Sequence, residues 1–158
     1  MKKKIDVTIN GELKSLEIES GEMLLDVLRR AGYRGAKVGC REGFCGACTV
    51  LLDGRPVNSC LVFAAKAEGR EITTIEGLGA PGRLHPIQEA FLSAGAVQCG
   101  YCVPGAVLSA KALLERNPRP TDADIRSALD GNLCRCTGYK KQIEAVRLAA
   151  GKLRGKKR

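Results

Sequence analysis

Eight cysteines carry the clearest chemical signal in this 158-residue chain, and their spacing divides them into two groups of four. The N-terminal quartet has the spacing C-x4-C-x2-C-x11-C and consists of Cys40, Cys45, Cys48 and Cys60. The C-terminal quartet has the spacing C-x2-C-x31-C-x-C and consists of Cys99, Cys102, Cys134 and Cys136. The first spacing is typical of plant-type [2Fe–2S] proteins, in which four thiolates hold the cluster. Two such clusters in one small chain indicate a protein that transfers electrons one at a time.

Glycines interleave with the first three cysteines of the N-terminal quartet, at Gly39, Gly43 and Gly46. Glycine accepts positive φ and close backbone approach, so this loop can wrap a compact cluster. Its N–H groups can then point at the sulfur atoms and stabilise the reduced state. We expect Cys60 to close the site from a strand that follows the Asp53–Gly54 turn.

The C-terminal quartet is built from two short motifs that each precede a predicted helix. Cys99 and Cys102 come before a helix that starts near Pro104, and Cys134 and Cys136 come before one that starts near Lys141. Free N–H groups and the macrodipole at a helix N-terminus favour thiolate charge. The sequence therefore predicts that two facing helix starts form the second site.

Two other uses of the cysteines remain as alternatives. Structural zinc also accepts four thiolates, but zinc ribbons usually pair two C-x2-C motifs, and the N-terminal spacing fits that pattern poorly. Disulfides are disfavoured in a reducing compartment, and C-x-C is awkward to cross-link. The corresponding alternative functions are a zinc-stabilised interaction module and a free-standing ferredoxin-like electron carrier or redox sensor.

The first half of the chain has the alternating pattern of a small sheet. We predict strands over 5–9 and 16–18 about an Asn10–Gly11 turn, a helix over 23–30, strands over 49–52 and 57–63, and a last strand from Ile72 to Ile75. After a glycine-rich linker over 77–82 the period becomes helical. We predict four helices there, over 86–94, from Pro104 to Asn117, after a Thr121–Asp124 capping box, and from Lys141 to Leu153.

These elements predict an α+β fold with two domains. Residues 1–77 form a compact strand-rich domain, residues 83–153 form a four-helix bundle, and residues 154–158 form a basic tail. The formal net charge is +9, but eight basic side chains lie at the two ends, and the rest of the chain holds 18 basic and 17 acidic residues. We interpret the basic ends as solvated and partly disordered, since no nucleic-acid motif accompanies them.

Targeting signals are not evident in the sequence. No apolar run approaches the ~20 residues that span a bilayer, and the N-terminus lacks the apolar region of a secretory signal. Eight cysteines in such a chain are typical of metal ligands in a reducing compartment, so we expect a cytoplasmic protein.

Three motifs resemble those of the molybdenum hydroxylases. Residues 40–50, CREGFCGACTV, are similar to the N-terminal cluster loop of that family. Residues 98–105, QCGYCVPG, and 131–139, GNLCRCTGY, are similar to its second cluster motif. In this order the motifs cover nearly the whole chain, which resembles the separate small iron–sulfur subunit of the xanthine dehydrogenase family.

This resemblance implies a β-grasp, plant-type ferredoxin-like domain followed by an all-α four-helix domain, each with one [2Fe–2S] cluster. It implies a large partner subunit with a molybdopterin cofactor, a medium subunit with FAD, and a dimer of heterotrimers. Electrons would pass from the molybdopterin site through the C-terminal quartet and then the N-terminal quartet to FAD. Gln98 and Cys136 would lie close to the pterin, and the chain would contribute no catalytic residue of its own.

Within the family, residues 58–61 and 93–99 most resemble the small subunits of bacterial xanthine or purine dehydrogenases. Carbon monoxide, nicotinate, aldehyde and aromatic acyl-CoA oxidoreductases have the same kind of small subunit. One departure is Val103, where the family commonly has Ser or Thr, so we expect the helix at Pro104 to lack a hydroxyl cap.

Four further residues near these motifs have simpler interpretations. His85, the single histidine, is expected to start a helix. Tyr101 and Tyr139 are expected to shield the cluster and pack, and Arg135 to face either solvent or a subunit interface.

Overall fold

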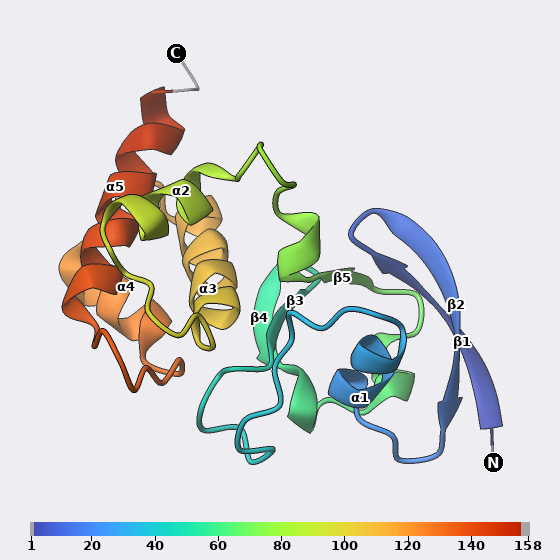
Figure 1. Cartoon of the computed structure of the whole chain (residues 1–158). Coiled ribbons are helices and arrows are strands. Elements are labelled where there is room, and N and C mark those ends of the chain that lie inside the picture. The colour runs from blue at the N-terminus through green and yellow to red at the C-terminus, as the bar shows by residue number, and fades with distance from the viewer. Residues whose placement is uncertain (1, 156–158) are drawn as a thin grey trace.

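The structure is a computed structural model that describes residues 2–155, with the strands and four of the helices on opposite sides of the molecule (Figure 1). Five strands form one mixed sheet in the order β2-β1-β5-β3-β4. They are β1 (Lys2–Ile9), β2 (Glu12–Glu19), β3 (Thr49–Leu52), β4 (Arg55–Asn58) and β5 (Glu71–Thr73). The β1–β5 pair is parallel and the other pairs are antiparallel. Asn10 and Gly11 take positive φ and make the predicted hairpin turn between β1 and β2.

Helix α1 (Leu24–Arg30) covers the sheet with one apolar face. Leu24, Leu25, Val27 and Leu28 are buried, and they share a core with the inward-facing Ile5, Val7 and Ile9 of β1. Fully burying such a side chain contributes roughly 1.5–3 kcal/mol. This core also takes in Cys48 and Cys60, so the N-terminal quartet is anchored in it.

Four helices follow, as predicted: α2 (Pro86–Ser93), α3 (Val103–Arg116), α4 (Asp122–Leu129) and α5 (Lys140–Gly155). They enclose a second, separate hydrophobic core. Capping boxes begin two of them, from His85 to Gln88 at α2 and from Thr121 to Asp124 at α4. Helix α3 also packs against β3 and β4, which joins the helices to the sheet. The α+β class is therefore confirmed, with a mixed sheet and five α-helices among the described residues.

The predicted C-terminal ends of two strands were wrong. The strand expected over 57–63 stops at Asn58, and Cys60 lies in a 3-10 turn over Ser59–Leu61. The Ser59 hydroxyl donates to the Cys48 carbonyl at 2.7 Å, which turns the chain toward the cysteine loop. Ile75 likewise lies in a 3-10 turn over Ile75–Gly77 instead of a strand.

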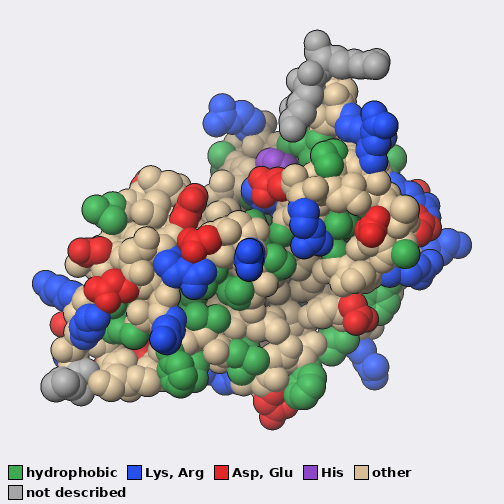
Figure 2. All heavy atoms as spheres, turned by 180° about the vertical axis from the view of Figure 1, so that it is seen from behind, with side chains coloured by type: hydrophobic (Ala, Val, Ile, Leu, Met, Phe, Trp, Pro, Cys, Tyr) green, Lys and Arg blue, Asp and Glu red, His purple; other side chains and the backbone are tan. Residues whose placement is uncertain are grey.

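The basic ends are more ordered than we expected from the sequence. Lys2 and Lys3 belong to β1 and form ion pairs with Glu17 and Glu68. Residues 154 and 155 continue α5, while residues 156–158 of the predicted tail lie outside the described residues. In Figure 2, Lys and Arg side chains are scattered over the visible face, with hydrophobic side chains exposed between them. From residue 2 to residue 155, none of the helices has both the length and the apolar character to cross a membrane.

Candidate metal centres

The four sulfurs of the N-terminal quartet are arranged as two pairs. The Cys45 N–H donates to Cys40 Sγ and the Cys40 N–H donates to Cys45 Sγ, both at 3.4 Å. Cys48 Sγ and Cys60 Sγ lie 3.4 Å apart. The first pair is half-buried and the second is buried. That all four residues hold one cluster stays a prediction.

Backbone N–H groups of the cysteine loop point at sulfur, as the glycine pattern predicted. The N–H groups of Glu42 and Cys45 hydrogen bond to the Cys40 sulfur and lower the pKa of this thiol to about 6. Burial has the opposite effect on Cys48, whose pKa is raised to about 11. The Cys40 thiol is therefore easily ionised at neutral pH, whereas the Cys48 thiol needs a bound cation to hold a negative charge.

Two features fix the shape of this loop. At Gly39 a Cβ atom would lie 2.4 Å from Cys45 Sγ, so only glycine lets the backbone pass this close to the sulfur. Arg41 has a φ of +60°, an unfavourable value for a residue with a side chain. Its guanidinium donates two hydrogen bonds to the Asp26 carboxylate of α1, at 2.8 and 3.0 Å, and these tie the strained residue to the helix.

The C-terminal quartet lines one cavity of about 110 Å³. Its lining is formed by residues 98–103 and 133–137, which contain all four cysteines together with Gln98 and Arg135. Cys99 and Cys136 contact each other, as do Cys102 and Cys134. Each pair thus takes one sulfur from each motif, which the sequence alone did not reveal.

The two pairs of the C-terminal quartet differ in exposure. Cys99 and Cys136 are exposed, while Cys102 and Cys134 are less so. The contact with Cys99 raises the pKa of Cys136. Burial raises the pKa of Cys102 to about 11. Burial opposes ionisation of Cys134 too, but hydrogen bonds from Thr137 and from the Cys136 backbone outweigh it and lower the pKa to about 7.

Helix starts flank this cavity as predicted, with one correction. Cys102 is itself the N-cap of α3, and no side chain makes a capping hydrogen bond there. Val103 is the first helical residue, so it does not occupy the capping position that we assigned to it. Helix α5 begins at Lys140, close to the predicted Lys141.

A buried asparagine links the two cysteine sites. The Asn132 amide nitrogen donates to the Gly46 carbonyl at 3.1 Å and to Thr49 Oγ1 at 3.3 Å. Its amide oxygen accepts from the Ser109 hydroxyl of α3 at 2.8 Å. Gly46 makes this contact possible, since a Cβ there would lie 2.1 Å from the Gly131 carbonyl oxygen. Sequence reasoning did not identify Asn132, because its partners lie 23 to 86 residues away along the chain.

Gln142 is a second residue that sequence reasoning did not identify. It lies on α5, is fully buried, and donates from Nε2 to Cys102 Sγ at 3.6 Å. The sequence did contain a signal, because a polar residue stands four positions before Val146 in the apolar face of this helix.

The side chains fit a group with two metal ions. All eight cysteines are free thiols. Between residues 2 and 155, no three or more His, Cys, Asp or Glu side chains gather around a single ion position. Both quartets instead present two separate sulfur pairs. This arrangement matches a [2Fe–2S] cluster, which takes two thiolates on each of its two irons.

The tyrosines beside the cysteines tie loops together through hydrogen bonds. Tyr101 OH donates to the Val38 carbonyl at 2.6 Å, and Tyr139 OH accepts the Cys134 N–H at 3.2 Å. Arg135 is exposed. Both tyrosines are partly exposed, and their predicted role in shielding the cluster stays a prediction.

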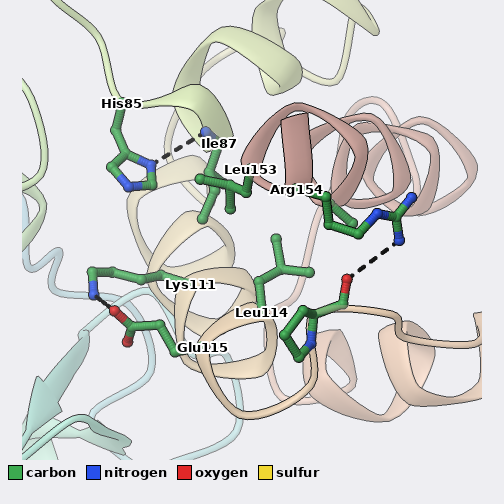
Figure 3. Close-up of a pocket in the computed structure, with 9 residues that line it drawn as sticks. His85, Ile87, Lys111, Leu114, Glu115, Leu153 and Arg154 are labelled. Atoms are coloured by element: carbon green, nitrogen blue, oxygen red, sulfur yellow. Dashed lines mark hydrogen bonds and ion pairs between the residues drawn. The ribbon is translucent and has the colours of Figure 1, made fainter. Parts of the chain in front are cut away.

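A larger hollow of about 270 Å³ lies away from the cysteines, between α2, α3 and the end of α5 (Figure 3). His85 caps α2 there, with Nδ1 accepting the Ile87 N–H at 3.3 Å, as its predicted helix-start role requires. Lys111 pairs with Glu115, and Arg154 donates to the Pro118 carbonyl at 3.4 Å. These cations are engaged within the chain, and the remaining lining is mostly apolar.

Comparison with known proteins matches both halves of the chain to iron–sulfur families. Residues 7–74 match the family described as 2Fe-2S iron-sulfur cluster binding domain, and residues 74–147 match the one described as [2Fe-2S] binding domain. The chain is 51% identical over 146 residues to the nicotinate dehydrogenase small FeS subunit of Eubacterium barkeri, covering 92% of this chain and 93% of that protein.

Two further relatives cover nearly the same span. The chain is 47% identical over 145 residues to the xanthine dehydrogenase iron-sulfur-binding subunit of Escherichia coli O157:H7, covering 90% of this chain and 91% of that protein. The crystal structure of quinoline 2-oxidoreductase from Pseudomonas putida 86 contains a chain that superposes with a TM-score of 0.92 at 41% identity. That match covers 98% of this chain and 97% of the other.

Proposed function

Because the chain belongs to the small iron–sulfur subunit family of the molybdenum hydroxylases, we propose that each cysteine quartet holds one [2Fe–2S] cluster. The chain is the electron-transfer component of an oxidoreductase complex and carries two such clusters. The assignment of all eight cysteines as their ligands is supported by the paired sulfurs in both quartets. When bound, the clusters supply one-electron oxidation and reduction.

We propose two domains with the predicted bounds, a β-grasp ferredoxin-like domain over 1–77 and a four-helix domain over 83–153. The two separate hydrophobic cores support this division. The segment 78–82 between them contains Leu78, which packs with the helical core, so the division falls close to the predicted linker.

We propose that electrons pass from the C-terminal quartet to the N-terminal quartet, and the exposure of the sulfur pairs supports this direction. The exposed pair, Cys99 and Cys136, faces outward, where a molybdopterin-containing partner would approach. Gln98 lines the same cavity and is exposed beside it, which supports the proposal that Gln98 and Cys136 contact the pterin. The less exposed pair includes Cys134. The residue before it, Leu133, donates a backbone hydrogen bond to Cys45 of the N-terminal quartet. Electrons would therefore enter at the C-terminal quartet and leave from the N-terminal quartet toward FAD.

A backbone hydrogen bond between the two cysteine sites gives this proposal its main support. The Leu133 N–H donates to the Cys45 carbonyl at 2.9 Å. Cys45 belongs to the N-terminal quartet, and Leu133 immediately precedes Cys134 of the C-terminal quartet, so the two sites are in direct contact. A stand-alone carrier needs only one cluster, whereas a relay needs two that are coupled. A zinc module would require four sulfurs around one ion, which fits poorly with separate sulfur pairs.

Partner subunits are implied by this relay role. The named relatives are small subunits of larger enzymes, and we propose a molybdopterin-binding large subunit and an FAD-binding medium subunit for this chain, assembled as a dimer of heterotrimers. The relatives reported above are named after nicotinate, xanthine and quinoline, so we propose a nitrogen heteroaromatic substrate for the complex. Eight free thiols are consistent with the reducing cytoplasm that we propose as its location.

The experiment that tests this function is anaerobic isolation of the chain from its native host, followed by substrate addition. We expect molybdenum- and FAD-containing subunits to co-purify with it. Addition of nicotinate, xanthine or quinoline should bleach the iron–sulfur absorption, while benzaldehyde should not. A chain that isolates alone would contradict the relay role, and bleaching by benzaldehyde only would contradict the substrate class.

A further inference from the structure

Gln142 is the only described side chain with a buried polar atom that has no hydrogen-bond partner. The side chain is 0% exposed and lies among the apolar residues of α5. Its Nε2 donates to Cys102 Sγ, while its Oε1 has no donor within reach among residues 2–155. A buried amide with an unpaired oxygen costs free energy that an apolar residue of similar size would avoid.

The orientation of this amide suits a sulfur that ligates a cluster. A cluster ligand is a thiolate, which can only accept hydrogen bonds. The amide presents its N–H to Cys102 Sγ, at a distance of 3.6 Å that suits the large sulfur atom. Cys102 is half-buried, so a hydrogen bond to it is weakly screened by water.

We propose that Gln142 tunes the reduction potential of the cluster held by the C-terminal quartet, by donating a hydrogen bond to the Cys102 thiolate. This inference rests on the proposed function, because it requires a cluster at that quartet. Reduction adds negative charge to the cluster and its ligands, and a hydrogen bond to a ligand sulfur stabilises that charge. Gln142 is thus a positioning residue that raises the potential and makes this cluster easier to reduce.

The decisive variant is Gln142→Met in the full chain. Methionine has nearly the same length and fills the same space, but it cannot donate a hydrogen bond. We expect the ratio of reduced to oxidised cluster at a fixed potential to fall about tenfold, which for one electron is a shift of about 59 mV to lower potential. The cluster of the N-terminal quartet should keep its midpoint.

In Gln142→Met the midpoint potential of the cluster should fall while the melting temperature does not. Because Oε1 is unpaired, the Met variant should unfold at the same temperature as the wild type or at a higher one. A purely structural role for Gln142 would instead lower the melting temperature and leave the midpoint unchanged. Gln88→Met is the matched control, since it breaks the capping box of α2. It should lower the melting temperature without moving either midpoint.

Iron and sulfide contents and the two EPR signals are measured first, in the wild-type chain. If the wild type lacks the second cluster, the proposed function of the C-terminal quartet fails, and this inference fails with it. If both clusters are present in Gln142→Met and neither midpoint moves, only the inference is overturned.

A measurement on the wild-type protein decides the matter if the Met variant does not assemble the cluster. The chain is labelled with 15N in the glutamine side-chain amides, and the reduced cluster is examined by pulsed EPR. We expect a weak 15N coupling that persists in Gln98→Ala, which removes the glutamine that lines the cavity. Absence of this coupling in the wild type would overturn the proposal.

Discussion

The backbone N–H of Leu133 donates to the carbonyl of Cys45 at 2.9 Å, and this hydrogen bond joins the two cysteine quartets. Leu133 immediately precedes Cys134 in the chain. The path from the sulfur of Cys134 to the sulfur of Cys45 therefore consists of covalent bonds and one hydrogen bond. Such a path couples two redox sites more effectively than a gap through space.

Leu133→Pro should slow electron equilibration between the two clusters, because proline has no N–H to donate. We expect the lost hydrogen bond to lower the stability by about 1 kcal/mol. Rapid-freeze EPR after a reducing pulse measures the equilibration rate. Leu133→Ala is the matched control, since it keeps the N–H and removes a side chain that is 55% exposed. Equal rates in both variants would contradict this role for the hydrogen bond.

Asn132→Ala should weaken the contact between the sheet and the helices. The substitution leaves the Ser109 hydroxyl without its buried acceptor and removes one donor to the Gly46 carbonyl, which keeps its hydrogen bond from the Thr49 hydroxyl. We expect a loss of about 1–3 kcal/mol, since an unpaired buried hydroxyl pays its desolvation cost. Urea unfolding followed by circular dichroism should show a lower midpoint. Ser109→Ala removes one of these bonds and should cost about 1 kcal/mol. An unchanged midpoint in Asn132→Ala would contradict the bridging role.

Asp26→Asn should loosen the cysteine loop of the N-terminal quartet. Arg41 is held at positive φ by its two hydrogen bonds to the Asp26 carboxylate, and the neutral amide cannot accept both. We expect faster loss of iron to a chelator from the N-terminal site and no change at the C-terminal site. The measurement is iron release followed by EPR of each cluster. Asp53→Asn, which removes an ion pair with Arg70 elsewhere on the sheet, should release iron as the wild type does.

Much of the local chemistry could be predicted from the sequence, because it depends on neighbouring residues. The cysteine spacing, the Asn10–Gly11 turn and the Thr121–Asp124 capping box all involve residues a few positions apart. The glycines of the cysteine loop likewise indicated a backbone that passes close to sulfur, as Gly39 does.

What the sequence could not predict depends on long-range packing. The pairing of Cys99 with Cys136 needs the relative placement of two helices that start 37 residues apart in sequence. The 3-10 turn at Cys60 replaces a strand because the Ser59 hydroxyl bonds to the distant Cys48 carbonyl. Gln142 lies in the apolar face of α5, whose pattern predicted core packing but not the hydrogen bond to Cys102.

Glu22 provides a pH-dependent contribution to stability. Its side chain is 14% exposed, and hydrogen bonds from Arg30 hold the pKa of this carboxyl below its usual value of 4.5. A lowered pKa stabilises the folded state above the unfolded-state pKa, and this stabilisation is lost as the pH falls through the folded-state value. We expect Glu22→Gln to lower the stability by up to about 1 kcal/mol at pH 7.

The difference between Glu22→Gln and the wild type should persist down to about pH 4.5 and shrink below it. Urea unfolding at a series of pH values measures this difference. Arg30→Gln removes the partner of Glu22, so its stability difference from the wild type should also shrink below about pH 4.5. A difference that stays constant to pH 3.5 would contradict the assignment.

EPR of the reduced full chain shows whether the two quartets hold two separate [2Fe–2S] clusters. The wild type should contain about 4 iron atoms per chain and give two signals. Cys45→Ser should perturb one signal and leave the signal of the helical domain largely intact, and Cys102→Ser should do the reverse. Loss of both signals from either single substitution, or a colourless protein loaded with zinc, would contradict the presence of two separate clusters.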